Sequence, residues 1–148
     1  MTRNSVSLLQ YSGYLLVAAL ASVFYNAATG EAGYNAHGIT GLASCGGAAV
    51  LSAVLGILTG KGQSWAAWVG LTLSFVLFAF GGHKVFDILR DLDASALDIY
   101  KKRAAEGITE NGARNAAIYR AGIFGFMMIV SLLTFLKLGL SLRHGKTA

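Results

Sequence analysis

Four long apolar runs constrain the fold of this chain more than any other feature. They cover residues 8–28, 39–58, 65–82 and 121–142, and Lys137 is the only charged residue within them. A helix needs about 20 apolar residues to cross the roughly 30 Å hydrocarbon core of a bilayer. Because a bilayer offers no water to unpaired backbone groups, such runs are expected to be helical. We therefore predict an all-α polytopic membrane protein, in which residues 1–148 form one compact bundle of four transmembrane helices.

The composition agrees with this prediction and excludes several other classes. Hydrophobic residues make up 55% of the chain and charged residues 13%, whereas soluble domains average about 25% charged residues. The single cysteine, Cys45, excludes an intramolecular disulfide and a zinc site built on paired cysteines. The net charge of +5 would indicate nucleic acid in a soluble protein. Here the basic residues lie between apolar runs, so we expect membrane lipids as partners and no nucleic acid.

The distribution of basic residues leaves the orientation open. With four spans, both chain ends lie on one side of the membrane. That side has four basic residues, and the other side has six or seven. This difference does not decide which side is cytoplasmic. We expect an integral membrane protein of a bacterial inner membrane or of an organelle, mitochondrial or plastid, and the sequence does not distinguish them.

The segment 83–120 is the one long hydrophilic part of the chain. Its first half is amphipathic, because apolar residues recur at steps of three and four, which is typical of a helix with one apolar face. That face could lie on the membrane surface, cover the end of the bundle, or dock onto a partner protein. Residues 109–112 are predicted to form a turn before the last span. The apolar face consists of Val85, Ile88, Leu92, Ala96 and Ile99.

A stripe of small residues follows the second apolar run at strict four-residue steps. In lipid, helices associate where small side chains allow their backbones to approach closely. We expect this small-residue stripe to pack within the bundle, and we keep two alternatives, a contact with another subunit and a groove for a lipid-like ligand. The stripe consists of Thr40, Ser44, Ala48, Ser52, Gly56 and Gly60.

No combination of residues indicates catalysis. The three histidines lie at or beyond the ends of the apolar runs, no acidic residue lies within a run, and neither a nucleophile motif nor a phosphate-binding glycine pattern occurs. We therefore expect no enzyme, no metal and no cofactor. Lys137 is the one candidate site residue within a span. It either extends its ammonium group to the interface beside Arg143 or contacts an anionic headgroup or a ligand carboxylate.

Three short segments resemble the transmembrane-protein-14 family, which includes the plastid fatty-acid-export proteins. These are Gly13-Tyr14, residues 38–43 (GITGLA), and the final segment with Ala121-Gly122 and residues 137–141 (KLGLS). The resemblance implies a small four-helix membrane protein that binds or passes fatty acids or other hydrophobic organic acids, with Lys137 as a candidate anion contact. The long charged segment 83–120 departs from the short, proline-containing link of that family and leaves the cargo open.

Two function hypotheses follow. The first is a small carrier or binding protein for fatty acids or similar lipid-like organic acids, based on the resemblance, the small residues and Lys137. The second is a non-catalytic accessory subunit of a larger, energy-converting membrane complex, based on the small size and on the amphipathic face near Ile99. Self-association through the small-residue stripe is a third, weaker hypothesis.

Overall fold

The structure is a computed structural model that describes residues 2–24, 36–103, 105 and 107–144. Within these residues it contains five helices and no strand, which confirms the all-α prediction. The helices are α1 (Arg3–Val23), α3 (Ala36–Gly60), α4 (Ser64–Arg90), α5 (Leu92–Arg103) and α6 (Glu110–His144).

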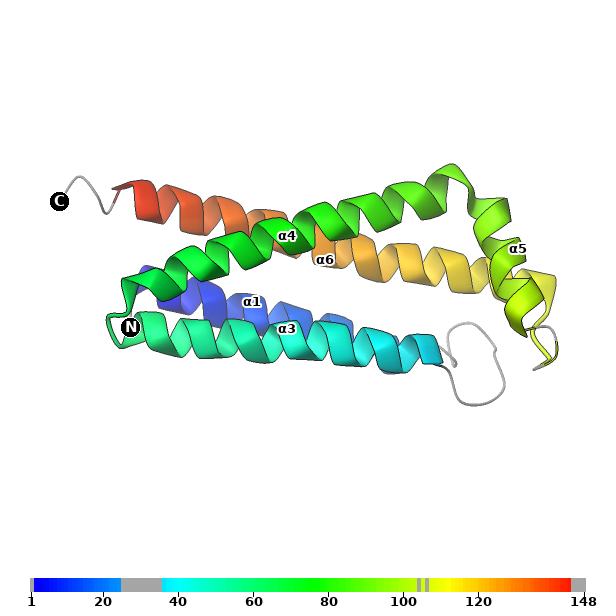
Figure 1. The fold of residues 1–148 in the computed structure, drawn as a ribbon, viewed down its shortest axis with the longest axis horizontal. Helices are drawn as coiled ribbons and strands as arrows, with labels where there is room; N and C mark the ends of the chain where they lie inside the picture. The colour runs from blue at the N-terminus through cyan, green and yellow to red at the C-terminus, as the bar shows by residue number, and fades with distance from the viewer. Residues whose placement is uncertain (1, 25–35, 104, 106, 145–148) are drawn as a thin grey trace.

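The four long helices form two antiparallel pairs, α1 with α3 and α4 with α6, and α4 runs diagonally across α6 (Figure 1). The start of α1, the connection between α3 and α4, and the end of α6 lie together at the left of Figure 1. We call this the turn end. The last turns of α4, the whole of α5 and the first turns of α6 lie at the opposite end, which we call the cap end.

All four long helices are long and apolar enough to cross a membrane. Their lengths differ, however. With 21, 27 and 35 residues, α1, α4 and α6 measure about 32, 40 and 52 Å at about 1.5 Å per residue. The helices that contain the third and fourth predicted spans are longer than those spans, since α4 continues to Arg90 and α6 already begins at Glu110. The end of the first predicted span, residues 25–28, lies outside the described residues.

The predicted amphipathic segment is divided between two helices. The chain bends at Asp91, which has φ −126° and ψ 54°, so that Ile88 belongs to α4 and Ile99 to α5. The bend allows both isoleucines to be buried, because Ile88 and Ile99 then join one cluster with Ala113 and other residues of α6. A straight continuation of α4 would carry Ile99 away from α6 into solvent.

The predicted turn at residues 109–112 is instead the beginning of α6. The hydroxyl oxygen of Thr109 accepts a hydrogen bond from the backbone N–H of Gly112 at 3.0 Å. This bond satisfies one of the free N–H groups of the first helical turn, as an N-cap residue does. The polar residues that suggested a turn therefore start a helix.

The bundle core lies where α1 meets the other three long helices. Leu8, Tyr11 and Leu15 of α1 are completely buried, and Leu8 shares a cluster with Leu138 of α6 and residues of α3 and α4. The outward faces are also apolar, because many large hydrophobic side chains of all four helices are exposed. A surface of this kind suits contact with lipid better than contact with water.

Candidate functional site

The small-residue stripe of α3 divides between two faces. The backbone oxygen of Gly56 accepts a hydrogen bond from the Ser5 hydroxyl at 2.8 Å, and Ser52 is completely buried. Ser44, by contrast, is exposed. A row at four-residue steps turns by about 40° per step around a helix of about 3.6 residues per turn, so six members cannot all face one neighbour.

Most of the described part of the stripe packs inside the bundle against α1. A methyl group on Gly60 would lie 3.0 Å from the Ser5 hydroxyl oxygen, and Ala48 packs against the core cluster that contains Tyr11. The side chain of Thr40 lies outside the described residues. The intramolecular interpretation therefore fits this packing, and the stripe does not line a ligand groove along its buried half.

The predicted docking face of the amphipathic segment is covered by the chain itself. Ile88, Ala96 and Ile99 are each at most 9% exposed, and Val85 and Leu92 are half-buried. Their partners include the alanine-rich first turns of α6. Of the three placements considered, this face covers one end of the bundle.

Lys137 is exposed, two turns before the end of α6. Among the described residues it forms no ion pair, and it lines none of the three cavities described next. The carrier hypothesis expected Lys137 to lie beside a groove of small residues. The described part of the structure does not bring the two together.

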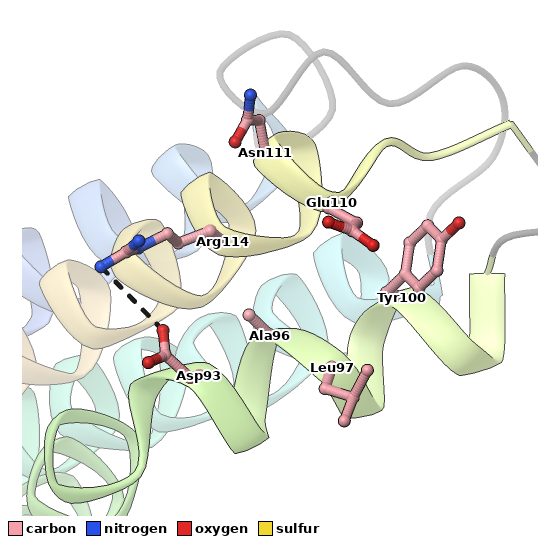
Figure 2. A pocket seen from close by; sticks show the side chains of 7 residues that line it. All are labelled: Asp93, Ala96, Leu97, Tyr100, Glu110, Asn111 and Arg114. Carbon is pink, nitrogen blue, oxygen red and sulfur yellow. Dashed lines mark ion pairs between the residues drawn. The ribbon is translucent and has the colours of Figure 1, made fainter.

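A polar pocket of about 330 Å³ lies between α5 and the first turns of α6. Figure 2 shows Asp93 of α5 and Arg114 of α6 reaching toward each other at one end of it, and Tyr100 and Glu110 at the other end. The Arg114 Nη2 and Asp93 Oδ1 atoms are 4.0 Å apart, and the two side chains are 58% and 90% exposed. An exposed ion pair of this length contributes little, so the guanidinium remains available to another anion. The pocket is lined by Asp93, Ala96, Leu97, Tyr100, Glu110, Asn111 and Arg114.

An apolar groove of about 420 Å³ lies further along α6, where α6 meets the last turns of α1. Gly122 leaves this groove open, because a methyl group added there would meet no atom within 4 Å. The Tyr119 hydroxyl donates a hydrogen bond to the Ala21 backbone oxygen at 2.7 Å and ties the two helices together beside the groove. The lining residues are Val17, Ala18, Ala21, Ile118, Tyr119, Gly122, Ile123 and Phe126.

Residues of α6 at four-residue steps line first the polar pocket and then the apolar groove. Arg114 lines the pocket, and Ile118, Gly122 and Phe126 line the groove. All four positions are exposed, and residues four apart on a helix are neighbours on its surface. We call these four residues the α6 row. It places a cation in the polar pocket, one helical turn before the first α6 residue that lines the apolar groove.

A third cavity, of about 450 Å³, lies between α3 and α4. Its lining is Leu51, Trp68, Val69, Thr72, Leu73 and Val76, without a charged residue. It can hold an apolar chain but offers no ionic contact for an acid. The described part of the chain also contains no group of three or more metal-ligating side chains.

Sequence reasoning missed the α6 row. Arg114 was counted only among the charges of the hydrophilic segment, because α6 was expected to begin at residue 121. The signal was present in the spacing of Arg114, Ile118, Gly122 and Phe126 at four-residue steps. This spacing can be interpreted as one helical row only when residues 110–120 are recognised as helical.

Comparison with protein-family models, with curated proteins and with solved structures found no match to this chain. The resemblance to the transmembrane-protein-14 family therefore stays a hypothesis.

Proposed function

We propose that this chain is an integral membrane protein that binds fatty acids or similar long-chain organic acids. In this proposal the acid group lies at Arg114 and the hydrocarbon chain lies in the groove between α1 and α6. The observation that carries the proposal is the α6 row, which places an exposed guanidinium one helical turn before the first α6 residue that lines an apolar groove. An arginine suits this role because its planar group can bind both oxygens of a carboxylate.

The dimensions of the site are compatible with such a ligand. The groove volume of about 420 Å³ falls within the roughly 300–1,000 Å³ of known small-molecule sites. Arg114 and Phe126 are twelve residues apart, which corresponds to about 18 Å along the helix. The row therefore spans about one leaflet, and this supports binding of an acid from one side of the membrane more than its passage through the bundle.

Two carboxylates of the pocket oppose an anionic ligand. Asp93 competes for Arg114, and Glu110 lies at the other end of the pocket (Figure 2). Both side chains are exposed, so water weakens their repulsion. They nevertheless determine whether a substitution should strengthen or weaken binding. Removal of the Asp93 charge should strengthen the binding of an acid.

The alternative of an accessory subunit gains no specific support. One of its sequence arguments was the unpartnered apolar face that includes Ile88 and Ile99, and in the structure that face packs on α6. Its other arguments, the small size and the missing catalytic set, are unchanged. The fatty-acid hypothesis now rests on different observations, with Arg114 and the groove beside Gly122 in place of Lys137 and the small-residue stripe.

The test of the groove is photocrosslinking of the purified protein with a fatty acid that carries a diazirine in its chain. We expect labelling of residues 17–21 and 118–126, and competition by the unlabelled acid. Gly122→Phe should reduce this labelling at least fivefold, because the ring occupies the open space above Gly122. The control is Gly47→Phe, at an exposed α3 glycine that also has open space beside it. Equal labelling of both variants would contradict the proposal.

The test of the acid contact compares three substitutions of charged residues. We expect Arg114→Gln to weaken fatty-acid binding about tenfold, since a hydrogen bond to a charged group contributes about 1.5–3 kcal/mol. Asp93→Asn should strengthen binding, and Lys137→Gln should leave it unchanged. Arg90→Gln, which removes another exposed arginine at the cap end, is the matched control. A loss with Lys137→Gln alone would move the acid contact to the turn end.

A further inference from the structure

We propose that the turn end of the bundle binds the headgroups of anionic phospholipids and that this end therefore lies in the more anionic leaflet. The proposal uses a different part of the molecule from the acid-binding site. It requires only that the four long helices cross a bilayer. Four cations carry it, and we call them the turn-end cations: Arg3, Lys61, Lys137 and Arg143.

The turn-end cations come from three separate parts of the fold that meet at one end (Figure 1). Arg3 is the first residue of α1, Lys61 lies in the turn between α3 and α4, and Lys137 and Arg143 belong to the last two turns of α6. All four residues are exposed. They therefore come from three elements at one end of the bundle rather than forming a single cluster on one helix.

The turn-end cations have no carboxylate partner within the described residues. The five described acidic residues all lie at the cap end, in α4, at the bend after it, in α5 and in the first turn of α6. Every ion pair found among the described residues also lies at the cap end, for example the pair of Lys102 and Asp98 at 2.7 Å. Within the described residues, no carboxylate neutralises the positive charge of the turn end.

The two ends differ most in their acidic residues. The described residues between positions 84 and 120 include seven basic and five acidic ones, whereas the described turn end has four basic residues and no acidic one. A count of basic residues alone, as in the sequence analysis, hides this difference. Near a membrane surface each lysine or arginine adds about 1 kcal/mol of attraction to anionic lipids. Among the described residues, carboxylates that oppose this attraction lie only at the cap end.

The side chains at the turn end also suit the headgroup region. Trp65 and Trp68, the only tryptophans of the chain, lie exposed in the first turns of α4. Tryptophan prefers the interface between hydrocarbon and headgroups. Lys137 lies two turns inside this level, and its long apolar stem can extend the ammonium group to it.

The two tryptophans provide the measurement. The protein is reconstituted into vesicles of phosphatidylcholine with brominated phosphatidylglycerol, or of phosphatidylglycerol with brominated phosphatidylcholine. Quenching of tryptophan fluorescence then reports which lipid lies beside the turn end. We expect phosphatidylglycerol to be preferred about fivefold, the size expected for one basic side chain at a charged surface. Added salt should reduce this preference.

Two variants with equal loss of charge make the test specific. In the turn-end variant, Arg3, Lys61, Lys137 and Arg143 are changed to Gln, and the preference should fall to about onefold. In the cap-end control, Lys84, Arg90, Lys101 and Lys102 are changed to Gln, and the preference should persist. Circular dichroism checks that both variants are folded.

Three results would overturn the proposal. They are the absence of a preference in the unaltered protein, an equal loss in both variants, and displacement of the lipid by inorganic phosphate at equal phosphate concentration. The last result would indicate a site for a soluble anion instead of a lipid surface. None of these results depends on Arg114, so a failure here is distinguishable from a failure of the proposed acid binding.

Discussion

The α1–α3 interface and the α5–α6 interface are both closely packed, but by different means. Between α1 and α3, small residues and hydroxyl groups dominate: Ser5 and Ser12 each donate a hydrogen bond of 2.8 Å to a backbone oxygen of α3. Between α5 and α6, isoleucine and alanine side chains form the buried cluster, and charged residues such as Asp93 and Arg114 lie at its exposed edge.

The difference is the one expected if the four long helices cross a bilayer and the cap end lies in water. In lipid, burial of apolar surface gives little driving force, because the hydrocarbon chains are as apolar as leucine. Close backbone approach and hydrogen bonds between helices remain as the sources of stability. In water, burial of apolar side chains is itself the main driving force. The α1–α3 interface thus has the chemistry of a membrane interior, and the α5–α6 interface has the chemistry of a soluble domain.

The largest expected effect comes from a side chain placed between α1 and α3. We predict that Gly56→Leu destabilises the bundle by about 3 kcal/mol, the upper range for overpacking, because a methyl group there already lies 3.0 Å from Leu9 Cγ. The measurement is unfolding in mixed micelles at increasing dodecyl sulfate, followed by circular dichroism. Gly47→Leu, with open space at its position, is the control. Equal stability of the two variants would refute close approach at Gly56.

The second-largest effect is expected at the α5–α6 interface, which is held by apolar burial as in a soluble domain. Ile99→Ala should cost about 2 kcal/mol, since truncation of a buried isoleucine removes apolar burial and leaves a cavity; Ile99 is 3% exposed. We expect faster hydrogen exchange in α5 and residues 108–117, with no change in α1 and α3. Leu97→Ala, at a residue that is 49% exposed, serves as the control. Faster exchange throughout the molecule would mean that the two interfaces unfold as one unit.

A smaller effect is expected from a hydrogen bond inside the bundle. The Tyr11 and Ser131 hydroxyl groups lie 2.6 Å apart and are completely buried. Tyr11→Phe should cost about 0.6 kcal/mol, the average for side-chain hydrogen bonds within membranes. The dodecyl sulfate titration measures this cost. Tyr14→Phe, at an exposed position of α1, should have no effect, and a similar loss in both variants would argue against a role for the Tyr11 bond.

The smallest effect is expected at an ion pair on the surface of the cap end. Lys102 and Asp98 lie 2.7 Å apart, but their side chains are 67% and 62% exposed. Lys102→Gln should change the stability of α5 by no more than about 0.5 kcal/mol. Hydrogen exchange of α5 with and without added salt measures this change. A larger change, abolished by salt, would show that charge contributes more to this interface than apolar burial does.

The sequence predicted the parts of the fold that depend on long uniform patterns. Four apolar runs gave four long helices, because a run near Leu15 or Val130 leaves the backbone no other way to pair its polar groups in lipid. Residues 110–120 were harder to assign. Their alanines and polar residues carry no long apolar run, and α6 continues through them because Ile88 and Ile99, distant in sequence, pack on Ala113 and Ala117.

The candidate site was predicted less well than the fold, for a related reason. Lys137 stood out because it is charged within an apolar run, whereas Arg114 was one charge among many. What distinguishes Arg114 is its place in the polar pocket, two helical turns before Gly122 of the apolar groove. That place depends on the packing of α1 and α5 against α6, which local sequence spacing does not contain.

For the proposed membrane protein, the unequal helix lengths make α1 the helix most sensitive to the thickness of the bilayer. With 21 residues, or about 32 Å, α1 just matches a hydrocarbon core of roughly 30 Å. The longer α4 and α6 continue beyond it into the cap end. In a thicker bilayer, α1 alone has no spare length, and the mismatch costs fractions of a kcal/mol per Å. A preference of this protein among membranes of different thickness would therefore be determined by its first helix.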